Sequence, residues 1–420
     1  MKMLLKNGNV YTPFGFKKAD VSVCDGIITS VCFNICDDGF DSVFNIDGLY
    51  LLPAFADVHV HLREPGFSYK ETIKSGTEAA AKAGYSLLCS MPNLSPVPDT
   101  LPHLREQLDI ISRDAAVEVL PFASITIGQK GKELVDFDSL APFVAGFSDD
   151  GKGVQGSAVM RKAQEEAARL GKLISAHCED EELLRGGYIH DGAYAKSHGH
   201  RGICSESEWG QLLRDIELVR QTNCRYHACH ISAKESVELI RKAKREGLPV
   251  SCETAPHYLT LCDEDLQEDG RFKMNPPLRS REDKAALIEG LLDGTIDVIA
   301  TDHAPHSFEE KSRGLELSNM GITGLETAFP VLYTELVETG VITLERLTEL
   351  MSINPRKLLS REFGIEEGKQ ADFAVVDLNT EYTIDSSSFL SKGRATPFEG
   401  KRVRGVNTMT VCGGKVVYSR

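Results

Sequence analysis

The sequence predicts an α/β protein: a (β/α)₈ barrel of the TIM type, with a small β-sandwich domain built from the N- and C-terminal segments. Three observations lead to this prediction. Eight short apolar segments alternate with helical segments through the middle of the 420-residue chain, as in βα units around a parallel sheet. Hairpin signals lie near both ends of the chain. Histidines and aspartates follow the strands at their carboxyl ends, where barrels place their chemistry.

The composition is that of a soluble globular protein. Hydrophobic residues make up 41% and charged residues 26% of the chain, and no run approaches the ~20 apolar residues that a membrane span needs. The first residues have no apolar core, so we expect no secretion signal and a cytoplasmic location. The net charge of -15 without a basic stripe argues against nucleic-acid binding. Eleven scattered cysteines are expected to be reduced.

Both ends of the chain have the pattern of short strands. Asn7-Gly8 and Asp25-Gly26 separate apolar pairs, which is typical of hairpins. Extended apolar runs return at 371–377 and 409–418. The predicted domains are residues 1–50 and 361–420 as the two parts of the β-sandwich domain and residues 51–360 as the catalytic barrel.

Eight strands are predicted in the barrel segment. The first begins at Pro53 and ends with His59 and His61. The other seven are 85–91, 117–127, 145–148, 173–176, 225–229, 248–253 and 297–301. Helices are predicted at 71–83, 101–113, 157–170, 206–222, 233–246 and 280–293. A doubly wound open sheet is the alternative fold, but no Gly-x-Gly-x-x-Gly turn follows the first strand.

Candidate metal ligands stand at the strand ends. His59 and His61 are two residues apart, so an extended chain presents both on one face. The full set is His59, His61, Asp150, His177, His230 and Asp302. Four imidazoles and two carboxylates are enough for two divalent ions; zinc is favoured, with manganese or cobalt left open. Each residue alone has an ordinary structural interpretation, such as a helix N-cap for an aspartate, but six coincident placements favour a dinuclear site.

The motifs around these residues resemble a known family. They are Asp57–Gly66, Met91-Pro92-Asn93, Phe147–Gly151, Ala176–Glu179, Cys229–Ser232, Lys273–Arg279 and Ala300–His306, of which the first and last are the most specific. Together they are similar to the amidohydrolase superfamily and, within it, to the class I dihydroorotases, over most of the chain. Hydantoinases, dihydropyrimidinases and allantoinases share the paired histidines and the final aspartate.

Two features separate the chain from those relatives. The relatives usually bridge their metals with a carboxylated lysine, whereas the matching stretch here is Asp149-Asp150-Gly151. Which of the two aspartates bridges is left open, and a carboxylated Lys152 is a weaker alternative. The second feature is Arg63, which suits bidentate binding of a substrate carboxylate.

The resemblance implies a reaction. It is the reversible cyclisation of N-carbamoyl-L-aspartate to L-dihydroorotate in pyrimidine biosynthesis, with a hydroxide held between two metal ions and Asp302 as the proton carrier. The alternatives are another cyclic amidohydrolase and, less favoured, a scaffold protein without catalysis.

Substrate contacts are expected from several residues near the ligands. Arg63, Asn93 and His306 are expected at the substrate carboxylate, and Asn275, Met320 and Gly321, with His61 close by, at the ring. The polar segment 307–319 is either a cover for the site or an ordinary surface loop. A homodimer and a complex with other enzymes of the pathway are left open.

Overall fold

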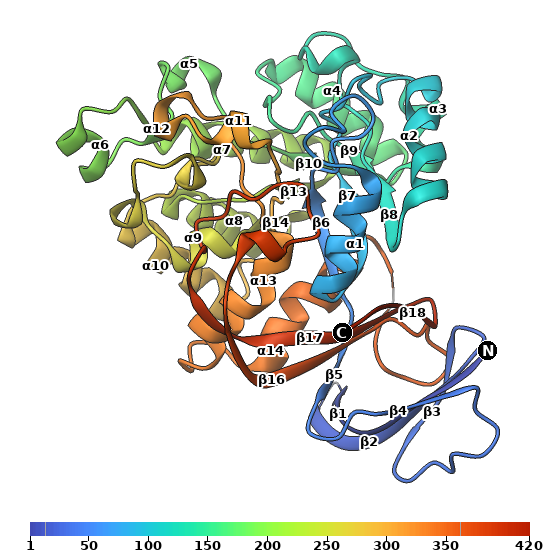
Figure 1. The fold of residues 1–420 in the computed structure, drawn as a ribbon. Helices are drawn as coiled ribbons and strands as arrows, with labels where there is room; N and C mark the ends of the chain where they lie inside the picture. The colour runs from blue at the N-terminus through green and yellow to red at the C-terminus, as the bar shows by residue number, and fades with distance from the viewer. Residues whose placement is uncertain (13, 362) are drawn as a thin grey trace.

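The computed structural model describes residues 1–12, 14–361 and 363–420. Parallel strands form its centre, with helices around them (Figure 1). The strands are β6 (Phe55–Val60), β7 (Tyr85–Ser90), β8 (Glu118–Pro121), β9 (Gly146–Phe147), β10 (Leu173–Ala176), β13 (Arg225–Ala228), β14 (Val250–Thr254) and β15 (Val298–Ile299). Each lies within or at a predicted strand, and the order along the chain is the order of the predicted βα units.

Two sheets join edge to edge to make the barrel. One contains β6, β7 and β8, and the other contains β9, β10, β13, β14 and β15. A parallel bridge between Ala123 and Phe147 joins β8 to β9. At the other seam Val60 bridges His303, and the His61 N–H donates to the His303 carbonyl at 2.8 Å. These contacts connect both pairs of edges, as a closed barrel requires.

Helices follow the strands and cover the outside of the barrel. The main ones are α1 (Ile73–Ala83), α2 (Leu101–Asp114), α4 (Ser157–Arg169), α7 (Glu206–Thr222), α8 (Lys234–Arg245), α10 (Arg281–Leu292) and α13 (Leu325–Leu332). In α8 the buried residues Val237, Ile240 and Ala243 recur at a spacing of three, so one face of the helix packs inward. None of the described helices is long and apolar enough to cross a bilayer.

Shorter elements lie in the loops. They are α3 (Phe137–Leu140), α5 (Glu181–Leu184), α6 (Ala193–His198), α9 (Pro256–Thr260), α11 (Phe308–Lys311), α12 (Gly314–Leu317), α14 (Leu344–Thr348), α15 (Asn354–Leu358), β11 (Ile189–His190) and β12 (Gly202–Ile203). The third barrel strand ends earlier than the predicted Ile127. It ends there because the N–H groups of Ile125 and Thr126 donate to the Asp149 carboxylate instead of to a neighbouring strand.

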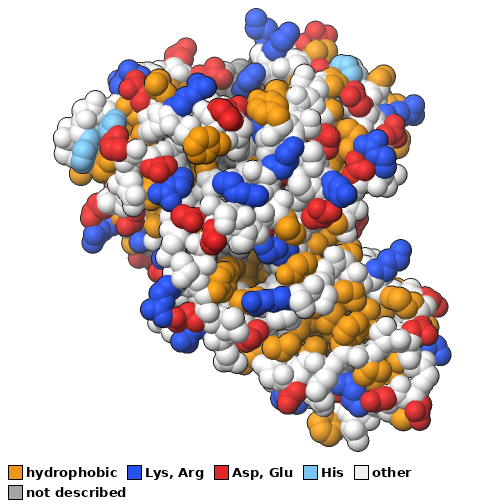
Figure 2. Space-filling view, viewed as in Figure 1, with side chains coloured by type: hydrophobic (Ala, Val, Ile, Leu, Met, Phe, Trp, Pro, Cys, Tyr) orange, Lys and Arg blue, Asp and Glu red, His pale blue; other side chains and the backbone are white. Residues whose placement is uncertain are grey.

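The terminal segments form one sheet beside the barrel. Its strands are β1 (Lys2–Thr12), β2 (Gly15–Cys24), β3 (Ile27–Cys32), β4 (Ser42–Asn45), β5 (Tyr50–Pro53), β16 (Phe373–Thr383), β17 (Arg402–Cys412) and β18 (Lys415–Ser419). The two predicted halves are continuous because β5 pairs with β1 on one side and β16 on the other. Figure 2 shows hydrophobic side chains gathered over this sheet. The exact domain bounds stay a prediction.

Arg356, in α15, links the last helix before the terminal sheet to the first strands of the barrel. Its buried guanidinium donates to the Ala54 carbonyl at 2.7 Å and to the Ser86 hydroxyl at 2.7 Å. It also lies over the Phe363 ring at 3.7 Å. One side chain therefore links the residue before β6 to a residue within β7.

We expect Arg356→Leu to lower the free energy of unfolding by about 2–4 kcal/mol, because the buried Ala54 carbonyl and Ser86 hydroxyl lose their charged partner. Urea denaturation followed by circular dichroism measures this. Arg161→Leu, at an exposed position of α4, is the control and should change stability by about 0.5 kcal/mol or less. Equal stability of the two variants would contradict the role given to Arg356.

Candidate active site

The six predicted ligands meet at the carboxyl ends of the barrel strands. His59 lies in β6 and His61 directly follows it, while Asp150, His177, His230 and Asp302 follow β9, β10, β13 and β15. All six side chains are buried. Residues separated by up to 243 positions of sequence therefore share one site because the barrel gathers its strand ends.

Two overlapping groups of ligand atoms can be distinguished. In one, His61 Nε2 lies 3.1 Å and His59 Nε2 lies 3.6 Å from Asp302 Oδ1. In the other, His177 Nδ1 lies 3.0 Å from His230 Nε2. Asp150 stands between the groups, with Oδ1 3.3 Å from His59 Nε2 and 3.6 Å from His230 Nε2. Nitrogen ligands on a tetrahedral zinc ion are roughly 3.3 Å apart, so these spacings suit metal coordination.

Several of these atoms have no hydrogen-bond partner within the described residues. They include His59 Nε2 and Asp150 Oδ1, which face each other across the site. Leaving buried polar atoms unpaired costs about 1–3 kcal/mol each. Two cations placed among the six ligands would satisfy these lone pairs, so the donor set fits the metal ions that the sequence predicts.

Asp149 and Asp150 have different surroundings although they are adjacent. Asp149 accepts from the Ile125 N–H at 2.8 Å, the Thr126 N–H at 3.1 Å and the Thr126 hydroxyl. Its carboxylate is thus occupied by Ile125 and Thr126, while Asp150 faces the histidines. Lys152 is exposed. The geometry therefore favours Asp150 over both alternatives as the residue between the two ion positions.

Buried side chains orient the ligand histidines from behind. Glu253 Oε1 accepts from His59 Nδ1 at 2.7 Å, and Glu253 Oε2 accepts from His227 Nε2 at 3.0 Å. Burial alone would raise the pKa of Glu253, but the charge of His59 and the bonds from both histidines lower it well below its usual range. Asn93 Oδ1 accepts from His61 Nδ1 at 2.8 Å. These bonds leave Nε2 of both histidines free to bind metal.

Glu179 performs a similar task for the next ligand. Its Oε2 lies 3.5 Å from His177 Nε2, and its Oε1 accepts from Asn275 Nδ2 at 2.8 Å. The sequence prediction missed Glu179 and Glu253. The available signal was a carboxylate inside or directly after an otherwise apolar strand, since such a group is buried only with a partner.

The backbone is strained at three positions of the site. Arg63, His230 and Asp302 have φ values of 60°, 31° and 47°, in the left-handed region that side chains with a Cβ rarely adopt. Such strain concentrates at functional sites, where surrounding contacts hold it in place. Asp57 supplies one such contact, because its buried carboxylate accepts from the His59 N–H and from Thr301 next to Asp302.

A cavity of about 230 Å³ opens beside the ligands. All the predicted substrate residues line it: His61, Arg63, Asn93, Asn275, His306, Met320 and Gly321. Asn93 and Asn275 already use one end of their amides on His61 and Glu179, so part of their expected role is structural. Gly321 has φ 128°, and a Cβ there would lie 2.7 Å from the Ala304 carbonyl oxygen. A side chain at 321 would therefore disturb the cavity wall.

Arg63 is the buried cation of this cavity. Its Nε donates to the Pro305 carbonyl at 3.2 Å, and a second nitrogen lies 3.3 Å from His306 Nε2. Burial lowers the pKa of Arg63 and also that of His306, to about 3, where the positive charges of Arg63 and Lys70 add to the effect. The two ring nitrogens of His306 lie 2.8 Å from the Met320 carbonyl oxygen and 3.0 Å from Glu310 Oε2. Within the described residues Arg63 has no carboxylate partner at ion-pair distance.

The segment 307–319 forms two short helices, α11 and α12, close to the cavity. Lys311 is buried and donates to the carbonyl oxygens of Lys273 and Asn319 at 2.9 Å and 2.8 Å.

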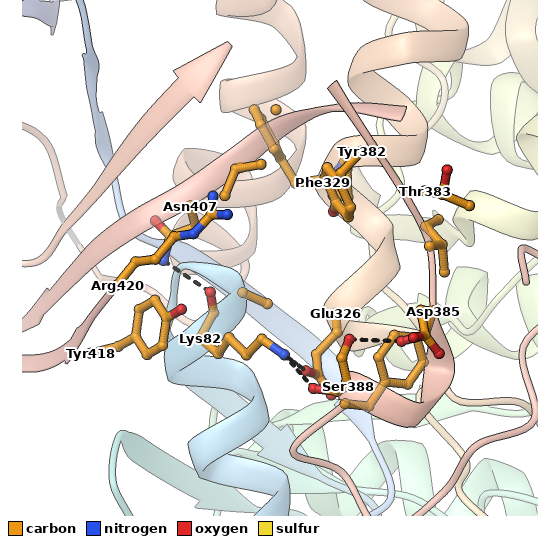
Figure 3. Close-up of a pocket in the computed structure, with 16 residues that line it drawn as sticks. Lys82, Glu326, Phe329, Tyr382, Thr383, Asp385, Ser388, Asn407, Tyr418 and Arg420 are labelled. Carbon is orange, nitrogen blue, oxygen red and sulfur yellow. Dashed lines mark hydrogen bonds and ion pairs between the residues drawn. The ribbon is translucent and has the colours of Figure 1, made fainter. Parts of the chain in front are cut away.

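A second cavity, of about 310 Å³, lies away from the six predicted metal ligands, where α1 and α13 meet the terminal sheet. Figure 3 shows it, with Lys82 and Glu326 paired at 2.9 Å. Its lining contains none of the six ligands.

Known proteins match the chain over nearly all of its length. A dihydroorotase from Fusobacterium nucleatum is 47% identical over 99% of this chain and 98% of its own. A dihydroorotase from Anoxybacillus flavithermus is 50% identical over 96% of this chain and 95% of its own. The family model described as dihydro-orotase-like matches residues 48–236.

Solved structures of related hydrolases share the fold. The L-hydantoinase (dihydropyrimidinase) from Arthrobacter aurescens is 26% identical to this chain, with a TM-score of 0.89. The superposition covers 99% of this chain and 96% of the hydantoinase. A D-hydantoinase is 23% identical, with a TM-score of 0.88, which shows the fold alone. The barrel prediction is thereby confirmed. The chain belongs to the dihydroorotase family of cyclic amide hydrolases.

Proposed function

We propose that this protein catalyses the reversible cyclisation of N-carbamoyl-L-aspartate to L-dihydroorotate, a step of pyrimidine biosynthesis. Relatives that are 47% and 50% identical over nearly the whole chain are named dihydroorotase. The observation that carries the proposal is Arg63, a buried guanidinium in the cavity wall without a carboxylate partner among the described residues. A buried charge needs an opposite charge, and the free carboxylate of this substrate supplies one.

Two divalent metal ions, most favourably zinc, are proposed as cofactors. His59, His61 and Asp302 would hold one ion and His177 and His230 the other, with Asp150 between them. Four buried carboxylates surround these positions: Asp150, Asp302, Glu179 and Glu253. Two divalent cations would balance their charge. When bound, such ions lower the pKa of the attacking water towards ~7 and polarise the amide carbonyl.

Asp302 is the proposed proton carrier. Its buried carboxylate lies among the proposed metal ligands, with Oδ1 3.1 Å from His61 Nε2 and 3.6 Å from His59 Nε2, so in its ionised form it can accept a proton at this position. In hydrolysis it takes the proton of the attacking water and delivers it to the ring nitrogen as the amide C–N bond breaks. In synthesis it removes the proton from the ureido nitrogen, which then attacks the side-chain carboxyl carbon with loss of water.

The remaining cavity residues would bind the substrate. Arg63 would form a bidentate pair with the substrate carboxylate, next to His306, and Asn275 with the backbone around Met320 and Gly321 would face the ring. A hydantoinase-like activity is the second candidate, because the solved structures that resemble the chain are hydantoinases. The buried Arg63 argues against it, because hydantoins without a carboxylate would leave this charge unpaired. Cytoplasmic location, a homodimer and a complex with pathway enzymes stay predictions.

Arg63→Met should lower kcat/KM for dihydroorotate about 10²–10³-fold, because a desolvated charge pair is lost, while bound metal per chain stays unchanged. Absorbance of the substrate and elemental analysis give the two numbers. Any turnover of hydantoin by the wild type should not fall in the same variant, because hydantoin has no carboxylate for Arg63 to bind. Unchanged dihydroorotate turnover would favour the hydantoinase reading.

Asp302→Asn should lower kcat about 10²–10⁴-fold, since the amide cannot carry the proton between water and nitrogen. Single-turnover and steady-state rates in both directions measure this loss. A variant with a tenth of the wild-type kcat would exclude Asp302 as the proton carrier.

Asp150→Asn and Asp149→Asn form a matched pair with opposite expectations. Asp150→Asn should reduce bound metal from about two ions to about one or none per chain, with little loss of stability, because Asp150 binds no backbone group of a distant strand. Asp149→Asn should keep the metal and lower the melting temperature, because the Thr126 hydroxyl loses its acceptor. Elemental analysis and thermal denaturation distinguish the two, and the reverse result would exchange the roles of these residues.

A further inference from the structure

A third cavity adjoins the proposed active site at the segment 307–319. It has a volume of about 510 Å³ and lies between the segments 268–271, 306–314 and 386–395. His306 lines both this cavity and the cavity beside the metal ligands. We call it the basic cavity, because its lining includes Arg271, Lys311, Lys392 and Arg394.

Both acidic residues of this lining have polar partners. Asp269 forms an ion pair with the Arg271 guanidinium at 3.0 Å, and Glu268 accepts from the Tyr194 hydroxyl at 2.9 Å and lies 2.8 Å from His200 Nε2. Lys311, Lys392 and Arg394 instead bind backbone carbonyl groups. Among the described residues, none of these three has a carboxylate at ion-pair distance. Burial lowers the pKa of Lys311 to about 7. The excess of positive charge in the basic cavity therefore comes mainly from Lys392 and Arg394.

This excess contrasts with the rest of the molecule. The chain has a net charge of -15, and acidic and basic side chains are interspersed over the face that Figure 2 shows. The overall field thus repels an anion. N-carbamoyl-L-aspartate carries two carboxylates and L-dihydroorotate one, so either substrate must be attracted by local charge.

We propose that the basic cavity is a capture site for the anionic substrate, in which Lys392 and Arg394 attract its carboxylate groups before it reaches Arg63. This inference rests on the proposed function. Neither side chain lines the cavity beside the metal ligands, so both act on encounter and not on the reacting atoms. Local fields of this kind raise association rates by about 10–10³-fold and weaken with salt.

The test compares three double variants of the full-length enzyme with wild type. Lys392→Gln/Arg394→Gln removes both charges, and Lys392→Arg/Arg394→Lys keeps them. Arg161→Gln/Lys162→Gln removes two exposed charges from α4 and is the control for net charge. The values of kcat and kcat/KM for dihydroorotate are measured from about 10 mM to about 500 mM ionic strength, where the Debye length falls from ~30 Å to a few Å.

The neutral variant should have a kcat/KM roughly three- to tenfold below wild type at low ionic strength, and the difference should vanish at high ionic strength. Its kcat should stay within about twofold of wild type. Because the equilibrium constant is fixed, kcat/KM must fall by the same factor in the synthetic direction. The charge-retaining variant and the α4 control should match wild type.

Two results would overturn the proposal: a neutral variant with wild-type kcat/KM and salt dependence, or equal losses in the neutral and charge-retaining variants. If the double variant fails to fold, Lys392→Gln alone, at an exposed side chain, gives the same comparison. Absence of dihydroorotate turnover in the wild type would instead reject the proposed function, so the two failures are distinguishable.

Discussion

The site depends on a cluster of buried nitrogen and oxygen atoms whose lone pairs face one another without hydrogen-bond donors between them. His59, His61, His177 and His230 point their ring nitrogens at two carboxylates, and several of these atoms have no partner within the described chain. Proteins rarely leave such groups unpaired. The free-energy cost of these unpaired atoms is offset by the hydrogen-bonded strands and packed helices of the barrel. The closed sheet therefore holds the donor cluster together before any cation binds.

A second layer of buried groups turns this cluster into a defined site. Glu253 and Asn93 each accept from Nδ1 of a ligand histidine, which fixes the tautomer and aims Nε2 inward. Glu253 comes from β14, a strand that provides none of the six ligands, so even a strand without a ligand contributes to the centre. Each carboxylate of this layer also adds negative charge, which favours divalent over monovalent ions.

Much of this organisation could be predicted from the sequence, because strand and helix periodicity and strand-end polar residues are local signals. The prediction placed eight strands in order and named the residues that the structure gathers. It could not choose between Asp149 and Asp150, since that choice depends on the N–H groups of Ile125 and Thr126, some 24 residues away. It also missed Glu179 and Glu253, whose importance lies in what they contact. The sequence also did not show that β5 joins the two terminal segments into one sheet, because its pairing partners β1 and β16 lie far apart in the chain.

Substrate choice within this fold rests on a few side chains around a common metal chemistry. The resemblance to hydantoinases in solved structures covers nearly the whole chain, so the barrel cannot distinguish a neutral cyclic amide from one with a carboxylate. Arg63 can, because its burial makes an unpaired charge costly and a paired one favourable. The left-handed backbone at Arg63 and the bond to Pro305 hold the guanidinium in the wall, and specificity follows from this fixed charge.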